Sequence, residues 1–265
     1  MRHNYKLTIE YDGTHFLGWQ IQPVGRTVQG DLENALKQLH PDQKITLIGS
    51  GRTDSGVHAR NQVAHIKLDT RLSDNDLKNA VNARLDKDVR IKAASKVSDS
   101  FHARYNPLWR QYSYFIRKSY SPLARFTTWW VRYPLIQEQL HVCANQVLGE
   151  HDFTSFCKAD AEVEHKRCFV EESHWSISAD NLTYSIRANR FLQHMVRYLV
   201  GTMVEVARGR YSEQDFSDLI HNTENNLSVV RAPAQGLILE EIKYPESGFS
   251  VQDTTTDSYE AAADK

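Results

Sequence analysis

Cysteine, methionine and long apolar runs are scarce in this sequence. Its 265 residues include only three cysteines (Cys143, Cys157 and Cys168) and three methionines. No apolar run approaches the roughly 20 residues that a helix needs to cross a bilayer, and the first residues lead into a strand pattern without the apolar core of a signal peptide. The odd, sparse cysteines are typical of a reducing compartment. These absences predict a soluble cytoplasmic protein that does not bind a membrane.

Metal and nucleotide motifs are missing as well. Cys157, His165 and Cys168 do not have the spacing of a zinc ligand set, and isolated buried thiols are the commoner arrangement. The glycine-rich segment that begins at Gly49 lacks the Gly-Lys-Ser/Thr ending of a Walker loop. The sequence therefore predicts no metal and no cofactor.

Acidic residues are absent from two long segments, although the net charge is only −1. Residues 100–137 contain no Asp or Glu, but they contain six Lys or Arg and eleven aromatic residues. Residues 181–204 also lack acids, whereas residues 240–265 carry seven acids and two lysines. Arginine and lysine bind phosphates and aromatic rings stack on unpaired bases, so this pattern favours an RNA surface. A solvated basic face with half of the rings in the core is the alternative.

Glycine is concentrated in residues 49–56, which follow an apolar run and have three glycines among eight residues. The pattern predicts a strand that ends in a tight loop. If the loop is extended, Arg52 and Asp54 project to the same side and form an ion pair that keeps the carboxylate charged. Such a carboxylate suits nucleophilic or electrostatic catalysis at a sugar carbon. The alternative is an ordinary surface turn.

The periodic patterns predict an α+β fold. The first hundred residues read as strand, helix, strand, strand, helix, strand, which suits helices on one face of a largely antiparallel sheet. Strands are expected at 5–11, 44–48, 62–68, 89–93, 111–116, 168–178, 182–188 and 238–243. Helices are expected to begin at residues 27, 73, 136, 191 and 212. Residues 247–265 have the composition of a disordered tail.

Several blocks resemble the TruA family of tRNA pseudouridine synthases. The clearest is Gly-Arg-Thr-Asp-Ser-Gly-Val-His-Ala at residues 51–59, with Ser55 where the family more often has alanine. Further blocks follow in order, at residues 18–20, 101–104, 110–114, 152–156, 189–197 and 232–237. The resemblance covers nearly the whole chain except the tail.

This resemblance implies four catalytic residues. Asp54 falls on the family's catalytic aspartate, and Tyr112 on its active-site tyrosine, which would pack on the uracil and take or relay a proton. Arg197 is placed at the active site, and with Arg52 it would hold Asp54 ionised and oriented. From the sequence alone, the favoured interpretation is that Arg197 extends to the surface along an apolar helix.

Substrate contacts are expected from a further set of residues. Leu237 would form an apolar wall of the uracil pocket, although a core leucine is the simpler interpretation. Arg104 and Arg110 would meet RNA phosphates, and His58 and Tyr112 would also bind the substrate. Trp19 is interpreted as a core residue in preference to an RNA platform, and the block at 152–156 as an Asp-capped turn with two anchoring rings.

The resemblance also implies the architecture and the substrate. It implies two similar α/β domains, each a mostly antiparallel sheet with helices on one face, about a central cleft. We expect these domains at 1–106 and 107–246, followed by the tail at 247–265. The implied substrate is tRNA, modified at uridines 38, 39 and 40 of the anticodon arm by a homodimer in which one tRNA touches both subunits.

Two other functions remain open at this point. A non-catalytic RNA-binding protein would keep the basic, aromatic middle of the chain but would not need Asp54, Arg52 and Arg197 together. A glycoside hydrolase or nucleosidase would break the same type of bond, but it usually needs a second carboxylate that this sequence does not place.

Overall fold

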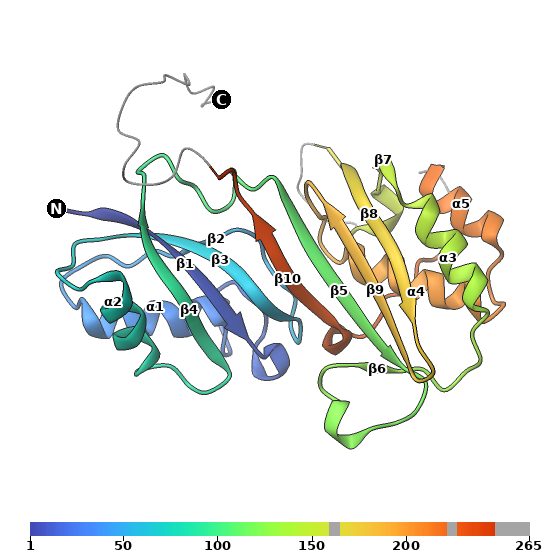
Figure 1. Cartoon of the computed structure of the whole chain (residues 1–265), viewed down its shortest axis with the longest axis horizontal. Helices are drawn as coiled ribbons and strands as arrows, with labels where there is room; N and C mark the ends of the chain where they lie inside the picture. Colours follow the sequence, from blue (N-terminus) through green and yellow to red (C-terminus); the bar gives the residue numbers. More distant parts are fainter. Residues whose placement is uncertain (159–164, 222–226, 247–265) are drawn as a thin grey trace.

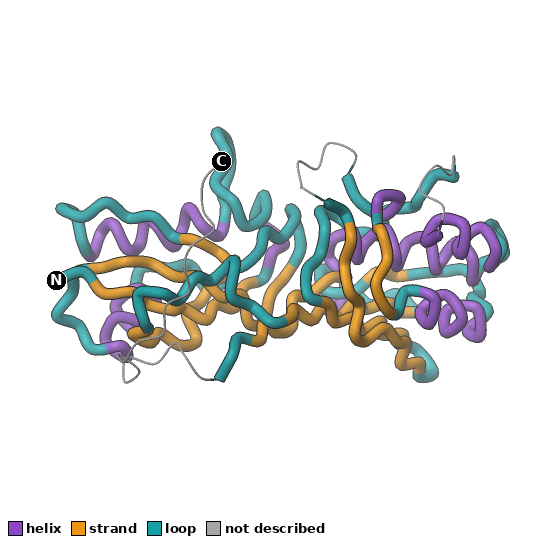
Figure 2. Tube along the Cα trace, turned by 90° about the horizontal axis from the view of Figure 1, so that it is seen from above, coloured by secondary structure: helices purple, strands orange, loops and turns teal. Residues whose placement is uncertain are grey.

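One ten-stranded mixed sheet runs along the molecule, seen in the computed structural model as a continuous band of strands (Figures 1 and 2). The structure describes residues 1–158, 165–221 and 227–246, so the predicted tail lies outside the described residues. The strands are β1 (His3–Tyr11), β2 (Ile48–Gly49), β3 (His58–Leu68), β4 (Val89–Val97), β5 (Trp109–Arg117), β6 (Trp129–Trp130), β7 (Gly149–Asp152), β8 (Arg167–Ile177), β9 (Asn181–Ala188) and β10 (Leu237–Lys243). The α-helices are α1 (Val28–Leu39), α2 (Asp74–Asn82), α3 (Gln137–Gln146), α4 (Met195–Ala207) and α5 (Glu213–His221).

The main path of the sheet is β4-β1-β3-β10-β5-β9-β8-β7. Its pairings are antiparallel except for β3 with β10, while β6 adds a second parallel pairing with β5. The expected α+β class and mostly antiparallel sheet are therefore confirmed. The last strand of the described residues lies in the middle of the sheet, because β10 is inserted between β3 and β5.

Two hydrophobic clusters cover the sheet, one toward each end. The first joins α1 and α2 to the strands of the first half; the second joins α3, α4 and α5 to β5, β8 and β9 (Figure 1). Leu239, Ile242 and Tyr244, which come last in the described chain, pack with the first cluster. Tyr112 packs against both clusters and so lies where the two halves meet.

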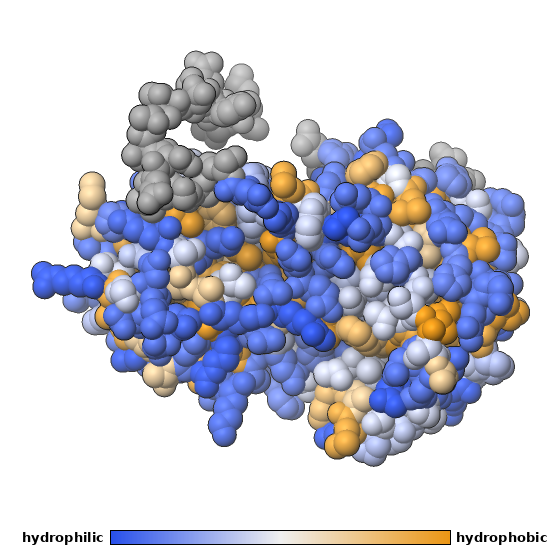
Figure 3. Space-filling model, in the orientation of Figure 1, coloured by the Kyte–Doolittle hydropathy of each residue, from blue (hydrophilic) through white to orange (hydrophobic). Residues whose placement is uncertain are grey.

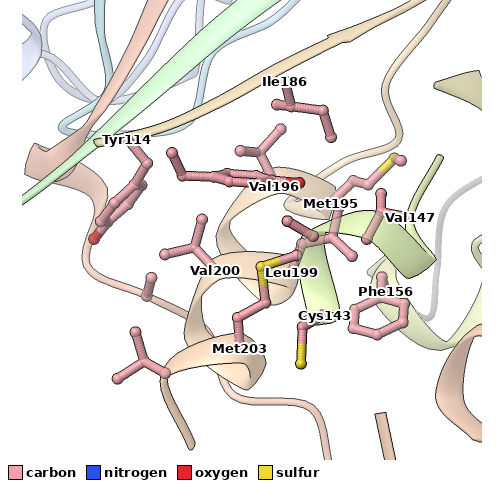
Figure 4. Packing of buried hydrophobic residues seen from close by; sticks show 14 of the residues in the cluster. Tyr114, Cys143, Val147, Phe156, Ile186, Met195, Val196, Leu199, Val200 and Met203 are labelled. Atoms are coloured by element: carbon pink, nitrogen blue, oxygen red, sulfur yellow. The ribbon is translucent and has the colours of Figure 1, made fainter. Parts of the chain in front are cut away.

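Helix α4 is the most deeply buried helix, and its residues from Met195 to Ala207 are nearly all buried. Leu199, Val200 and Met203 lie in one apolar cluster with Cys143 of α3 and the ring of Tyr114 (Figure 4). The helix begins four residues later than the sequence predicted. His194, directly before it, has a φ of 67°, in the left-handed region, which a continuous α-helix cannot include.

Local sequence signals explain several element boundaries. The Thr27 hydroxyl accepts a hydrogen bond from the Gly30 amide at the start of α1, and Ser73 accepts one from Asp76 at the start of α2, as N-cap residues do. Trp19 is buried, which confirms it as a core residue, and Asp152 accepts hydrogen bonds from Thr154, as a capped turn requires.

The strand expected at residues 44–48 is mostly wrong, because only Ile48 and Gly49 pair with β3. Its apolar residues instead help to close the first cluster, which Leu47 and Ile45 join. No helix among the described residues is long and apolar enough to cross a bilayer.

Candidate active site

Residues 16–19 hold the loop that carries Asp54 in place through backbone hydrogen bonds. The Trp19 amide donates to the Thr53 carbonyl at 3.1 Å, and the Gly56 amide donates to the Phe16 carbonyl at 3.3 Å. A Cβ on Gly18 would lie 2.6 Å from the Thr53 carbonyl oxygen, and the φ of Gly18 is +95°. Only glycine fits there, because the two backbones touch and the conformation is left-handed. The loop is therefore held rigidly before any substrate arrives.

Asp54 forms an ion pair with Arg197, from the other half of the chain. The Arg197 Nη1 donates to Asp54 Oδ2 at 3.0 Å, and its Nε donates to the Ala232 carbonyl at 2.9 Å. The Arg197 side chain is only 11% exposed and that of Asp54 18%. A charge buried to this extent needs a partner. The alternative, in which Arg197 extends to the surface, is therefore wrong.

Arg197 reaches Asp54 because α4 packs very closely against residues 228–234. A Cβ on Gly201, one turn after Arg197, would lie 2.0 Å from the Val230 carbonyl oxygen. The Ala232 amide also donates to the Arg197 carbonyl at 3.0 Å. The helix, the segment before β10 and the Asp54 loop thus meet at one guanidinium.

The parallel pairing of β3 and β10 explains the position of Leu237. The Asp54 loop runs into the start of β3, and Leu237 is the first residue of β10, so both lie at the same edge of the sheet. Gly56 and Ala234 come close there, since a Cβ on Gly56 would lie 3.2 Å from the Ala234 Cβ. Leu237 is buried within the second cluster beside this junction.

Tyr112 lies beside Leu239 of β10 and Ile186 of β9 in the sheet register. Its ring packs edge-on against Phe191, with 5.0 Å between the ring centroids. Burial raises the pKa of the Tyr112 hydroxyl to about 12; Arg110 opposes the rise and the Asp54 carboxylate adds to it. The hydroxyl is therefore protonated near neutral pH. In this state it suits proton donation better than the base role expected from the sequence.

Arg52 does not form the ion pair that the loop sequence predicted. Its side chain is exposed, and no hydrogen bond or ion pair joins it to Asp54 among the described residues. The Asp54 carboxylate pairs with Arg197 instead.

His58 is buried and fully used by the protein. Its Nδ1 accepts from the Gly13 amide at 3.0 Å, and its Nε2 lies 2.8 Å from the Phe126 carbonyl oxygen. Because Nδ1 is an acceptor, Nε2 carries the proton and donates it to Phe126. With both ring nitrogens occupied, His58 has none to offer a substrate. The expected substrate contact is replaced by a structural role.

The two arginines expected to meet phosphates have different surroundings. Arg104 is exposed, with its guanidinium 5.8 Å from the centroid of the exposed Tyr105 ring. Arg110 instead donates to the backbone carbonyls of Ser50, Arg104 and Asn189. Burial lowers the pKa of Arg110, and its hydrogen bonds tie the two halves together. Arg110 is thus built into the structure as well as adding positive charge.

His194 is a site residue that the sequence reasoning missed. Its Nε2 lies 3.5 Å from Asp54 Oδ1, and Arg231 lies 3.5 Å from its Nδ1. Burial lowers the pKa of His194, with Asp54 opposing and Arg231, Arg197 and Lys158 contributing, so the ring is neutral near neutral pH. The available signal was its position in the sequence, because His194 lies only three residues before Arg197 and so close to the same site.

No group of three His, Cys, Asp or Glu side chains that could hold a metal occurs among the described residues. Cys157 and Cys168 are both buried. What the site offers is one carboxylate held by a guanidinium, a protonated phenol and apolar walls. A fixed anion suits a reaction in which positive charge develops on a sugar carbon.

Sequence comparisons agree with this geometry. The model of a family described as tRNA pseudouridine synthase matches residues 7–106 and 143–245. A protein of Halalkalibacterium halodurans named tRNA pseudouridine synthase A is 41% identical over 234 residues, 88% of this chain and 89% of that protein. Proteins of the same name from Brachyspira hyodysenteriae and a Geobacillus strain are 40% and 38% identical over 238 and 246 residues; these cover 88% and 92% of this chain and 95% and 99% of theirs. The chain therefore belongs to the TruA family of tRNA pseudouridine synthases and is an isomerase that acts on uridine in tRNA.

Proposed function

We propose that this enzyme converts uridines 38, 39 and 40 in the anticodon arm of tRNA to pseudouridine, with Asp54 as the catalytic carboxylate. The observation that carries the proposal is the ion pair between Asp54 and Arg197, which places one charged carboxylate between the halves of the chain. In the reaction the N1–C1′ bond breaks and a C5–C1′ bond forms. C5 then loses its proton and N1 gains one, so that no atom is gained and no redox step occurs.

The other site residues have supporting roles in this proposal. Arg197 keeps Asp54 charged and aimed at the ribose. Tyr112 packs on the uracil and donates or relays a proton through its hydroxyl. Leu237 forms the apolar wall of the uracil pocket, and Arg52, being exposed, acts on the RNA rather than by pairing with Asp54.

The RNA-binding arrangement is part of the proposal too. The two halves, residues 1–106 and 107–246, act as domains on either side of an RNA cleft, and Arg104 and Arg110 supply positive charge there. The enzyme works as a cytoplasmic homodimer in which one tRNA touches both subunits. Support comes from the acid-free basic segment at 100–137, because phosphates respond to local charge more than to the net charge.

The test is the variant Asp54→Asn. It should bind tRNA as the unchanged enzyme does, yet release no tritium from tRNA labelled at C5 of uridine, because the amide keeps the shape but loses the charge. Carbodiimide mapping should find pseudouridine at 38–40 only with the unchanged enzyme. Substantial turnover by Asp54→Asn would refute the role, and free uracil among the products would indicate a nucleosidase instead.

A further inference from the structure

We call residues 118–133 the aromatic arm. A hollow lies on the surface beneath this arm. The arm leaves the end of β5, forms a short 3₁₀ turn and returns through β6; in Figure 1 it projects below the sheet beside the label β6. Figure 3 shows pale and orange atoms among blue ones at the same place. The hollow has a volume of about 240 Å³ and is lined by Ser119, Tyr120, Ser121, Arg125, Thr128, Trp129, Trp130 and Gln235. We call it the Trp130 pocket.

The walls of the Trp130 pocket combine rings with polar groups. Trp130 is 44% exposed, and its ring centroid lies 5.2 Å from that of Tyr120, which is also exposed. Trp129 is fixed from behind by an edge-on contact with the buried Tyr114. Exposed aromatic faces beside hydroxyl and amide groups are what a flat, polar-edged ring needs in order to bind.

The charge around the pocket favours a polyanion. Arg125 stacks on Phe126 at 4.0 Å and forms no ion pair with a carboxylate among the described residues. Asp180, which accepts hydrogen bonds from Ser119, is neutralised by its ion pair with Arg117. The pocket therefore presents a net positive charge, as phosphates require.

Two contacts connect the pocket to the catalytic loop. The Phe126 carbonyl, within the aromatic arm, accepts the hydrogen bond from His58, which follows the Asp54 loop. Gln235 lies between Ala234, which approaches Gly56, and the start of β10 at Leu237. The aromatic arm is therefore held against the segments that border the Asp54 loop.

We propose that the Trp130 pocket binds one unpaired base of the tRNA substrate, separate from the target uridine, while Arg125 meets an adjacent phosphate. The inference rests on the proposed function. Ligand pockets for drug-sized molecules span about 300–1,000 Å³, so this smaller hollow suits a single base. Polar lining and positive charge favour RNA over a second copy of the chain, which would need a larger apolar surface.

The first experiment compares Trp130→Ala with Leu123→Ala. Leu123 lies on the same arm and is 96% exposed, but it does not line the pocket, so its variant is a matched control. Stacking of one base contributes about 1–3 kcal/mol, so Trp130→Ala should weaken tRNA binding about tenfold. The rate of Trp130→Ala at saturating tRNA should stay unchanged. Trp130→Phe, which keeps an aromatic ring, and the control Leu123→Ala should both bind tRNA as the unchanged enzyme does. Equal affinity of Trp130→Ala and the unchanged enzyme would overturn the proposal.

The second experiment identifies the base. Single abasic sites are placed in turn at the unpaired positions of the anticodon loop, and binding is measured by filter retention. An abasic site at one position should weaken binding to the unchanged enzyme but not to Trp130→Ala, because that variant already lacks the stacking contact between the base and Trp130. Because only binding is measured, this result stands even if the isomerisation at 38–40 fails. If no abasic position behaves in this way, the base-binding role is refuted. A change in molar mass in both Trp130→Ala and Leu123→Ala would also refute it, because the arm would then be an interface between copies.

Discussion

At the scale of the residue, the guanidinium of Arg197 determines whether the Asp54 carboxylate is positioned for catalysis. Arg197 donates from Nη1 to the Asp54 carboxylate and from Nε to a backbone carbonyl, so it fixes the direction of the Asp54 side chain. Arg52, two residues from Asp54 in the sequence, is exposed and makes no such contact. These two arginines can therefore be separated by experiment.

We expect Arg197→Ala to abolish turnover and to lower the free energy of unfolding by about 3 kcal/mol, because it leaves a mostly buried carboxylate without its partner. Arg52→Ala should change the free energy of unfolding by less than about 0.5 kcal/mol, as surface substitutions do. Urea denaturation and single-turnover assays measure both effects. A stable, active Arg197→Ala enzyme would show that the ion pair is incidental.

The residue types of the site were predictable, but their partnerships were not. The block resemblance pointed to Asp54, Tyr112 and Arg197, whose side chains the fold does bring near one another. The Arg52 pairing was wrong because Asp54 pairs with Arg197, which lies 143 positions away in the sequence, and no local pattern shows such a contact. His194 was missed although it lies three residues before Arg197, because the sequence does not show that its backbone is left-handed or that its ring lies beside Asp54.

His65 in β3 makes the stability of the fold depend on pH. Its Nδ1 accepts a hydrogen bond from the Ala103 amide, and burial lowers its pKa to about 4, with His102 and Lys67 adding to the shift. The unfolded chain, with a pKa near 6.5, binds this proton more readily. The free energy of unfolding should therefore fall as pH drops from about 6.5 toward 4, by at most about 3 kcal/mol from this group.

The variant His65→Asn checks this expectation, since its amide oxygen can accept from Ala103 without titrating. Thermal denaturation between pH 7 and pH 4 should give a shallower loss of stability for the variant than for the unchanged protein. Parallel curves for the two proteins would show that His65 is not the group responsible.

At the scale of the element, close backbone contacts hold the catalytic loop. Gly18 lies against Thr53 with a φ of +95°, whereas a Cβ on Gly51, in the same loop region, would meet nothing within 4 Å. Gly18→Ala should cost at least about 1–3 kcal/mol of stability through backbone strain, and it should lower turnover by displacing Asp54. Gly51→Ala is the matched control.

Thermal denaturation and tritium release measure the two glycine variants side by side. If Gly18→Ala leaves both stability and turnover unchanged, the loop is not held by this contact. A loss of stability without a loss of turnover would show that the contact supports the fold but does not position Asp54.

Element types were predictable where the pattern was long, and boundaries were predictable only where a capping residue marks them. The helices capped by Thr27 and Ser73 begin where their caps predicted. The strand expected at 44–48 is only the two-residue strand β2 in the structure, because apolar residues can be buried in a hydrophobic cluster without pairing as a strand. Helix α4 starts late because the conformation of His194 is set by the loop before it rather than by helix propensity.

At the scale of the whole molecule, positive charge is expected to set the affinity for tRNA. Arg104→Ala should weaken binding and lower the slope of log K against log salt by about one, as the loss of one phosphate contact does. Arg104 is the better probe than Arg110, whose removal also breaks hydrogen bonds between the halves. Salt titrations with tRNA measure the slope, and an unchanged slope would place the RNA elsewhere.

The general class of fold was predictable from the order of strands and helices, but the topology was not. No sequence signal shows that residues 237–243 insert between β3 and β5, because strand pairing over such separations is specified only by packing. The same insertion brings Leu237 to the Asp54 loop, so the assembly of the site follows from the topology.

The central position of β10 has a consequence for how this enzyme is made. On the ribosome, β3 and β5 emerge long before β10, which comes almost last in the described chain. Until then each half exposes an unpaired strand edge where the other half should join. A chain in which β10 has not yet been made therefore carries Asp54 without a working centre, and activity requires β10 to be in place.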